Sequence, residues 1–119
     1  MTEFVNAAKA KKPDVIVKVI IERYFITDEE LPIICNIIID SGADYIKEAT
    51  GYAPGEGKCG VEDIRMIKEI VKDKIKIKSA FTCGETLAEF VQAIELGADR
   101  IGGNCADVML EKTPDSFWA

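Results

Sequence analysis

The sequence predicts a single α/β domain in which four strand–helix units build a parallel sheet. Predicted strands begin near residues 15, 45, 75 and 100, and a segment of helical length separates each from the next. Hydrophobic residues make up 48% of the chain and charged residues 30%, which is typical of a globular domain. The 119 residues are too few for a complete eight-stranded α/β barrel, which needs about 250.

The first half of the chain contains two predicted strands around one helix. Residues 15–22 are rich in β-branched side chains and are long enough for a buried strand. A capping-box pattern at its start predicts a helix over 27–41, and Gly42 is suited to end it. Residues 45–48 follow as a short second strand. Residues 1–14 are expected to form an N-terminal extension.

The second half continues the same alternation. The segment Gly97–Ile101 repeats Gly42–Ile46 almost residue for residue, so each is predicted to be a helix-ending glycine that leads into a strand. Asp44 and Asp99 are expected to support these turns. The other predicted elements are a glycine-rich loop over 50–60, a helix over 61–72, a strand over 74–79, a helix over 86–96, a short helix from 106 and a tail over 111–119.

The charge of the chain and its lack of histidine exclude several classes of function. A net charge of −6 argues against a nucleic acid as partner, and no apolar run reaches the ~18 residues of a membrane span. Histidine is the commonest general acid–base and a frequent ligand of catalytic metals, so its absence removes most catalytic zinc and iron sites. Any chemistry is therefore expected to depend on Lys, Asp, Glu, Cys, Tyr or backbone groups. The amino terminus lacks the layout of a signal peptide, which predicts a cytoplasmic protein.

Three of the four cysteines follow predicted strands and would therefore share one rim of the sheet. They are Cys59, Cys83 and Cys105. Reduced, unliganded thiols are expected because no C-x-x-C pair occurs in the chain. A soft metal ion or a redox pair is the alternative.

Lysines interrupt the predicted strands, which is unusual for a parallel sheet that is covered on both faces. In the third strand, alternation places Lys74, Lys76 and Lys78 on one side. One interpretation is an edge strand whose lysines face solvent. The other is a polar cavity lined by alternate residues of neighbouring strands.

Lys47 and Lys78 come at or near the carboxyl ends of consecutive strands, which is where α/β folds place their chemistry. Adjacent parallel strands lie ~4.8 Å apart, so the two amines are expected to approach each other. Two like charges in a partly desolvated site lower each other's pKa, which leaves one lysine neutral near neutral pH. A neutral lysine is the nucleophile that forms a Schiff base with a carbonyl substrate.

Taken together, these segments resemble the deoxyribose-phosphate aldolases, a family of class I (Schiff-base) aldolases. The matching segments are Val17–Glu22, Thr27–Glu30, Gly42–Tyr52, Val61–Arg65, Lys76–Lys78 and Gly97–Gly102. They run in order over about residues 15–110 and correspond to the last four of eight strand–helix units. The resemblance therefore implies half of a TIM barrel.

The resemblance implies the reversible cleavage of 2-deoxyribose 5-phosphate to glyceraldehyde 3-phosphate and acetaldehyde, a lyase reaction of carbohydrate catabolism. In the family's pattern, Lys47 has the place of the Schiff-base lysine and Lys78 that of the lysine that lowers its pKa. This mechanism needs no cofactor, and the partner is a small aldehyde or a phosphosugar. The residues expected to contact the substrate are Glu22, Thr50, Gly51, Gly102, Gly103 and Asn104.

The chain also departs from the family's pattern. The family's first half is absent, together with an aspartate that assists proton transfer. Glu48 and Ala49 replace small hydroxyl residues after Lys47, where a carboxylate favours a charged lysine. Residues 79–86 lack the Gly-Gly pair and the arginine of the family's phosphate-binding loop. These departures favour a second hypothesis, a catalytically silent half-barrel that acts as an assembly or small-ligand-binding module. Open sheet edges predict a homo-oligomer in either case.

Overall fold

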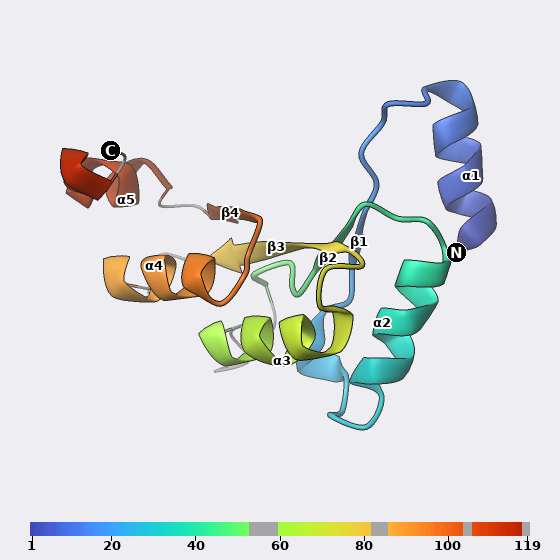
Figure 1. Ribbon diagram of the computed structural model, residues 1–119, viewed down its shortest axis with the longest axis horizontal. Helices are drawn as coiled ribbons and strands as arrows, with labels where there is room; N and C mark the ends of the chain where they lie inside the picture. Colours follow the sequence, from blue (N-terminus) through green and yellow to red (C-terminus); the bar gives the residue numbers. More distant parts are fainter. Residues whose placement is uncertain (53–59, 82–85, 104–105, 118–119) are drawn as a thin grey trace.

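The computed structural model describes residues 1–52, 60–81, 86–103 and 106–117, and it confirms the α/β class (Figure 1). Four strands form one parallel sheet in sequential order: β1 (Lys18–Ile20), β2 (Tyr45–Lys47), β3 (Lys76–Phe81) and β4 (Arg100–Gly103). The helices are α1 (Thr2–Lys11), α2 (Leu31–Asp40), α3 (Val61–Val71), α4 (Leu87–Glu95) and α5 (Ala106–Lys112), with 3₁₀ turns at Arg23–Phe25 and Asp115–Phe117.

Helices α2, α3 and α4 cover one face of the sheet, while α1 and α5 lie toward its two ends (Figure 1). The core between the sheet and these helices is aliphatic. Ile46 of β2 and Ile77 of β3 are fully buried there against Ile38, Ile64 and Ile67 of the helices. Because burial of these side chains fixes which face of each strand points to the helices, the alternate side chains must project from the opposite face.

That opposite face is open among the described residues, since Lys18, Lys76 and Arg100 on it are exposed, and the sheet has free edges at β1 and β4. β3 lies between β2 and β4, so the interpretation of the third strand as an edge strand is wrong. Lys76 and Lys78 therefore lie on an interior strand, β3, and on the uncovered face of the sheet. None of the helices in the described ranges is long and apolar enough to cross a membrane.

Two predicted strands have different bounds in the structure. The first is shorter than 15–22 because its only partner, β2, is three residues long. The third runs from Lys76 to Phe81 rather than over 74–79, because a left-handed residue, Lys72 with φ of 53°, and a bond from Lys74 N to Val71 O use residues 72–75 as a turn. Lys74 and Ile75 consequently lie outside the strand, whereas Ala80 and Phe81 belong to it.

The repeated glycine–alanine–aspartate segments have the predicted structural role. The carboxylate of Asp44 accepts from Val17 N at 2.7 Å, and that of Asp99 accepts from Ile77 N at 2.9 Å. The backbone N–H of Asp44 donates to Val17 O, and that of Asp99 donates to Ile77 O, at 2.9 Å in both cases. Each aspartate thus fixes its own strand against the preceding one. Gly42 precedes Asp44 at φ of +78°, a conformation that favours glycine.

A helix within the predicted N-terminal extension was not expected from the sequence. Val5 of α1 is 1% exposed, and Lys9 forms an ion pair of 2.9 Å with Asp44. The bonds from Val17 N and Lys9 lower the pKa of Asp44. Helix α1 is therefore attached to the sheet through the same aspartate that fixes β2.

Candidate active site

The open face of the sheet carries the two lysines that the sequence singles out. Lys47 ends β2, and its Cα partner in the parallel register is Lys78 of β3. Both project away from the helices, because Ile46 and Ile77 point into the core. The strand register thus makes them direct neighbours on one face.

Lys78 is half-buried, and its amine lies against backbone rather than carboxylates. Its Nζ donates to Ser79 O at 2.7 Å and lies 3.4 Å from Gly102 O. Burial lowers the pKa of Lys78, and the positive charge of Lys47 lowers it further, whereas Glu48 opposes the shift. The environment therefore favours loss of the proton from Lys78.

Gly102 of β4 leaves the space that the Lys78 amine occupies. A Cβ atom at this position would lie 2.8 Å from Lys78 Nζ and 3.5 Å from its Cε. Any larger residue would push the amine away from its backbone acceptors. The sequence placed Gly102 among the substrate contacts, and the structure places it beside Lys78.

Glu48 lies on the other side of the sheet from the lysines and is fully buried. Its Oε1 accepts from Ser79 Oγ at 2.9 Å and also from Ala80 N, while Oε2 has no hydrogen-bond partner. Burial raises the pKa of Glu48 despite these bonds. The sequence predicted that this carboxylate favours a charged lysine, and its negative charge acts in that direction on Lys78.

Replacing Glu48 by glutamine is expected to change how stability depends on pH. A carboxyl with a raised folded pKa binds its proton more tightly when folded, so the free energy of unfolding falls as pH rises above its ordinary value of 4.5. Glu48→Gln should remove this contribution, so that the variant gains stability relative to the wild type as pH rises. Urea unfolding between pH 4 and pH 8 measures the effect. The exposed Glu29→Gln is the control, and an unchanged pH slope in Glu48→Gln would contradict the expectation.

Glu22 and Thr50 join the ends of β1 and β2 at the rim of the open face. Glu22 Oε2 accepts from Thr50 N at 3.1 Å and from Thr50 Oγ1. Glu22 follows β1 by two residues, and its backbone is left-handed, with φ of 48°. Its carboxylate reaches the loop that follows β2. Its Oε1 is buried without a partner. In the structure the Glu22 carboxylate thus binds a loop residue, Thr50.

Three predicted substrate-contact residues remain, and they are Gly51, Gly103 and Asn104. Gly51 follows Thr50 at φ of +88° and is exposed, and Gly103 ends β4. Asn104 lies outside the described residues, as do Cys59, Cys83 and Cys105, the three cysteines considered for a metal or a redox pair. The fourth cysteine, Cys35, is buried in α2, and burial raises its pKa to about 11.

Sequence reasoning did not single out two residues of the open face, Tyr45 and Arg100. Tyr45 stands two residues before Lys47, and the guanidinium of Arg100 lies 5.1 Å from the centre of its ring. The signal that would have identified Tyr45 is its strand position, because residues 45 and 47 must share a face. Arg100 could be identified only from the register of β4 against β3, in which Arg100 pairs with Lys78.

The curated relatives that match this chain, and several of the solved structures, are aldolases. The deoxyribose-phosphate aldolase of Carboxydothermus hydrogenoformans is 42% identical over 100 residues, covering 84% of this chain and 42% of that protein. The solved structure of QR15, an aldolase, superposes with a TM-score of 0.78 at 33% identity, over 93% of this chain and 51% of the other. The deoxyribose-phosphate aldolase of Aeropyrum pernix, described as tetrameric, superposes with a TM-score of 0.75 at 25% identity, over 99% of this chain and 47% of its own.

These matches cover most of this chain but only part of each relative. The chain spans about half the length of the curated relatives it matches. The open four-stranded sheet accordingly corresponds to about half of a barrel of the TIM type. No protein-family model matches the chain.

Proposed function

Because the chain belongs to the deoxyribose-phosphate aldolase family, of which it spans about half the length, we propose that it is an aldolase of the Schiff-base type. The proposed reaction is the cleavage of 2-deoxyribose 5-phosphate to glyceraldehyde 3-phosphate and acetaldehyde. The observation that carries the proposal is the pairing of Lys47 with Lys78, together with the lowered pKa of Lys78.

In the proposed mechanism, the unprotonated amine of Lys47, with the positive charge of Lys78 disfavouring a second charge beside it, attacks the aldehyde carbon of the open-chain sugar. Loss of water gives a protonated imine. The C3 hydroxyl gives its proton to a water molecule as the bond between C2 and C3 of the sugar breaks, which forms the aldehyde group of glyceraldehyde 3-phosphate. The electron pair of the broken bond forms the C1–C2 double bond of an enamine, and the π pair of the imine moves to its nitrogen. Protonation of the enamine at C2 and hydrolysis release acetaldehyde and restore the Lys47 amine.

The proposal assigns the remaining groups supporting roles. Gly102 and the Ser79 carbonyl hold the Lys78 amine in place on the open face. The Glu22–Thr50 bonds fix the loop that follows Lys47, so that this rim keeps its shape when substrate binds. The partner is a small aldehyde or phosphosugar, and the open edges at β1 and β4 are proposed to support self-association, in the cytoplasm.

A second candidate is a catalytically silent half-barrel that binds a small ligand or takes part in an assembly. The observation that favours it is the open sheet, because an uncovered face excludes water from a reacting imine less well than a closed barrel does. The two candidates differ in whether Lys47 forms a covalent imine.

Reductive trapping separates them. The wild-type chain is incubated with acetaldehyde and sodium borohydride, and its mass and proteolytic peptides are then measured. The aldolase proposal expects one ethyl group on Lys47, and borohydride alone is the control. A chain that gains no mass refutes the aldolase proposal and supports the silent module, and a label confined to Lys78 would show that the nucleophile is misassigned.

A further inference from the structure

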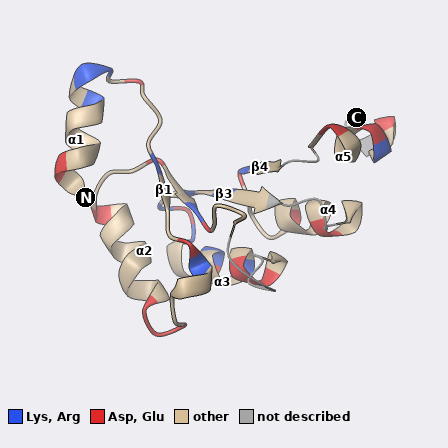
Figure 2. Ribbon diagram, turned by 180° about the vertical axis from the view of Figure 1, so that it is seen from behind, with Lys and Arg blue, Asp and Glu red and all other residues tan. Residues whose placement is uncertain are grey.

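Five cations share the open face of the sheet, and none of them has an acidic partner among the described residues. They are Lys18, Lys47, Lys76, Lys78 and Arg100, and no ion pair within 4.0 Å involves any of them. Figure 2 marks the Lys and Arg positions of the chain in blue. The chain as a whole carries a net charge of −6, so this concentration of positive charge is local.

Three of these cations converge on one aromatic ring. The amines of Lys18 and Lys76 lie 5.5 Å and 5.7 Å from the centre of the Tyr45 ring, and the Arg100 guanidinium lies 5.1 Å from it. They come from β1, β3 and β4, with Tyr45 on β2 between them. We call these four residues the Tyr45 cluster.

Tyr45 explains how three cations are held together without a carboxylate. The face of an aromatic ring attracts cations, which offsets part of their mutual repulsion. The ring is 6% exposed, whereas the three cations around it are exposed to solvent. The cluster is therefore arranged before any anion binds, which reduces the entropy that binding costs.

The nearby carboxylates are already engaged by other groups. Asp44 is close enough to Lys76 for that charge to lower its pKa, but its oxygens accept from Lys9 and from Val17 N. Asp99, next to Arg100, accepts from Ile77 N. These bonds keep both aspartates against the backbone and leave the cations free to bind an anion from solution.

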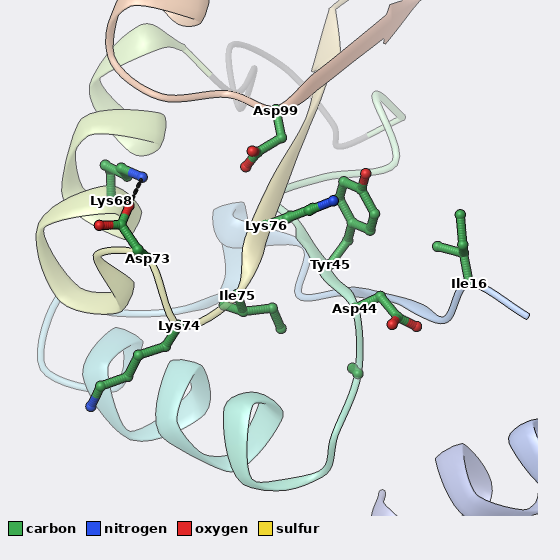
Figure 3. A pocket seen from close by; sticks show the side chains of 10 residues that line it. Ile16, Asp44, Tyr45, Lys68, Asp73, Lys74, Ile75, Lys76 and Asp99 are labelled. Carbon is green, nitrogen blue, oxygen red and sulfur yellow. Dashed lines mark hydrogen bonds and ion pairs between the residues drawn. The ribbon is translucent and has the colours of Figure 1, made fainter. Parts of the chain in front are cut away.

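A cavity of about 500 Å³ opens beside the cluster at the amino ends of the strands (Figure 3). Tyr45 and Lys76 line it together with Lys68 and Lys74. Three carboxylates also line it, Asp44, Asp73 and Asp99, of which Asp73 pairs with Lys68. In Figure 3 the Lys76 amine lies beside the Tyr45 ring, while Lys74 points away from it. The volume is in the range of small-molecule sites.

The geometry points to a second ligand site, in which the Tyr45 cluster binds the phosphate group of a small molecule. A phosphate is compact and doubly charged, so it matches three cations that surround a single ring. A second copy of this chain is a poor occupant, because two such faces would bring like charges together. An acidic protein surface would spread its charges over a larger area than the cluster occupies.

This site is distinct from the lysine pair proposed for catalysis. Tyr45 and Lys76 stand two residues before Lys47 and Lys78 on the same strands, toward the amino ends. Phosphate binding there needs no aldehyde and no imine. Absence of phosphate binding at the Tyr45 cluster would therefore leave the aldolase proposal unaffected, and absence of aldolase activity would leave the phosphate site unaffected.

Calorimetric titration of the full chain with inorganic phosphate and with glycerol 3-phosphate, at low ionic strength, tests the inference. Saturable binding of one equivalent is expected, and added salt should weaken it because the cluster is exposed. Equal affinities would identify the phosphate group alone as the ligand, and tighter binding of glycerol 3-phosphate would identify a phosphate ester. Absence of saturable binding by the wild type would overturn the inference.

Variants locate the site. The double variant Lys76→Gln/Arg100→Gln should weaken phosphate binding by about tenfold or more, because it removes two of three cations. Lys18→Gln, on the edge strand, is the second variant and should weaken it in the same direction. Lys72→Gln removes the same charge from an exposed residue of the turn before β3 that does not line the cavity, and it should change the affinity less than about twofold.

Two results would contradict the assignment. If the double variant binds phosphate as the wild type does, the ligand lies elsewhere. If poly-L-glutamate binds in a manner that depends on Lys76 and Arg100 while neither phosphate compound binds, the face docks an acidic protein instead. Circular dichroism of each variant verifies that it is folded.

Discussion

Lys47→Arg is expected to abolish the cleavage of 2-deoxyribose 5-phosphate, with a loss of at least about a thousandfold in kcat. Arginine keeps the positive charge beside Lys78, so the electrostatics of the pair change little. A guanidinium remains protonated in proteins and does not add to an aldehyde as an amine does. A coupled assay of glyceraldehyde 3-phosphate release measures the loss.

Lys74→Arg is the matched control for this prediction, because it makes the same exchange in the exposed turn before β3. Its rate should stay within about twofold of the wild type. If Lys47→Arg retains the rate of the wild type, Lys47 is not the nucleophile. The trapping experiment on the wild type then decides whether another lysine takes its place.

Ile77→Ala is expected to have the largest effect on stability, a loss of about 3 kcal/mol in the free energy of unfolding. The Ile77 side chain is fully buried near the start of β3, where it packs on the helices that cover the sheet. Truncation removes apolar contacts and leaves a cavity that neighbouring strands cannot fill without moving. Urea unfolding measures the change as a lower midpoint with a similar slope.

Ile37→Ala is the control for Ile77→Ala. Ile37 lies in α2 and is 51% exposed, so its truncation should cost less than about 1 kcal/mol. Equal losses in the two variants would show that the helices do not pack on β3 as described. The two isoleucines thus test the assignment of faces on which the candidate site depends.

The position of the lysine pair followed from the sequence, because alternation and strand order act over short distances. Residues 46 and 77 are isoleucines that alternate with polar or charged neighbours in their strands, so residues 47 and 78 had to face the other way. The environment of the pair did not follow. The acceptors of the Lys78 amine, Ser79 O and Gly102 O, depend on where β3 begins, and the turn at 72–75 moved that start by two residues.

Glu48 illustrates the limit of reasoning from neighbours in the chain. Its place next to Lys47 predicted an influence on a lysine, but adjacency in a strand puts two side chains on opposite faces. Its hydrogen bonds go to Ser79 and Ala80, which are more than 30 residues away. The carboxylate therefore joins β2 to β3 just beyond the lysines.

The sequence by itself determined the α/β class, the order of the strands and helices, the relationship to the aldolases and the face on which Lys47 and Lys78 stand. These depend on local periodicity, on capping patterns and on segments such as Gly42–Tyr52. Only the tertiary structure decided that the lysine face is open, that α1 attaches through Asp44 and that three cations surround Tyr45. The reason is that register and stagger between strands are set by packing against α2, α3 and α4, which brings together residues that no local pattern connects.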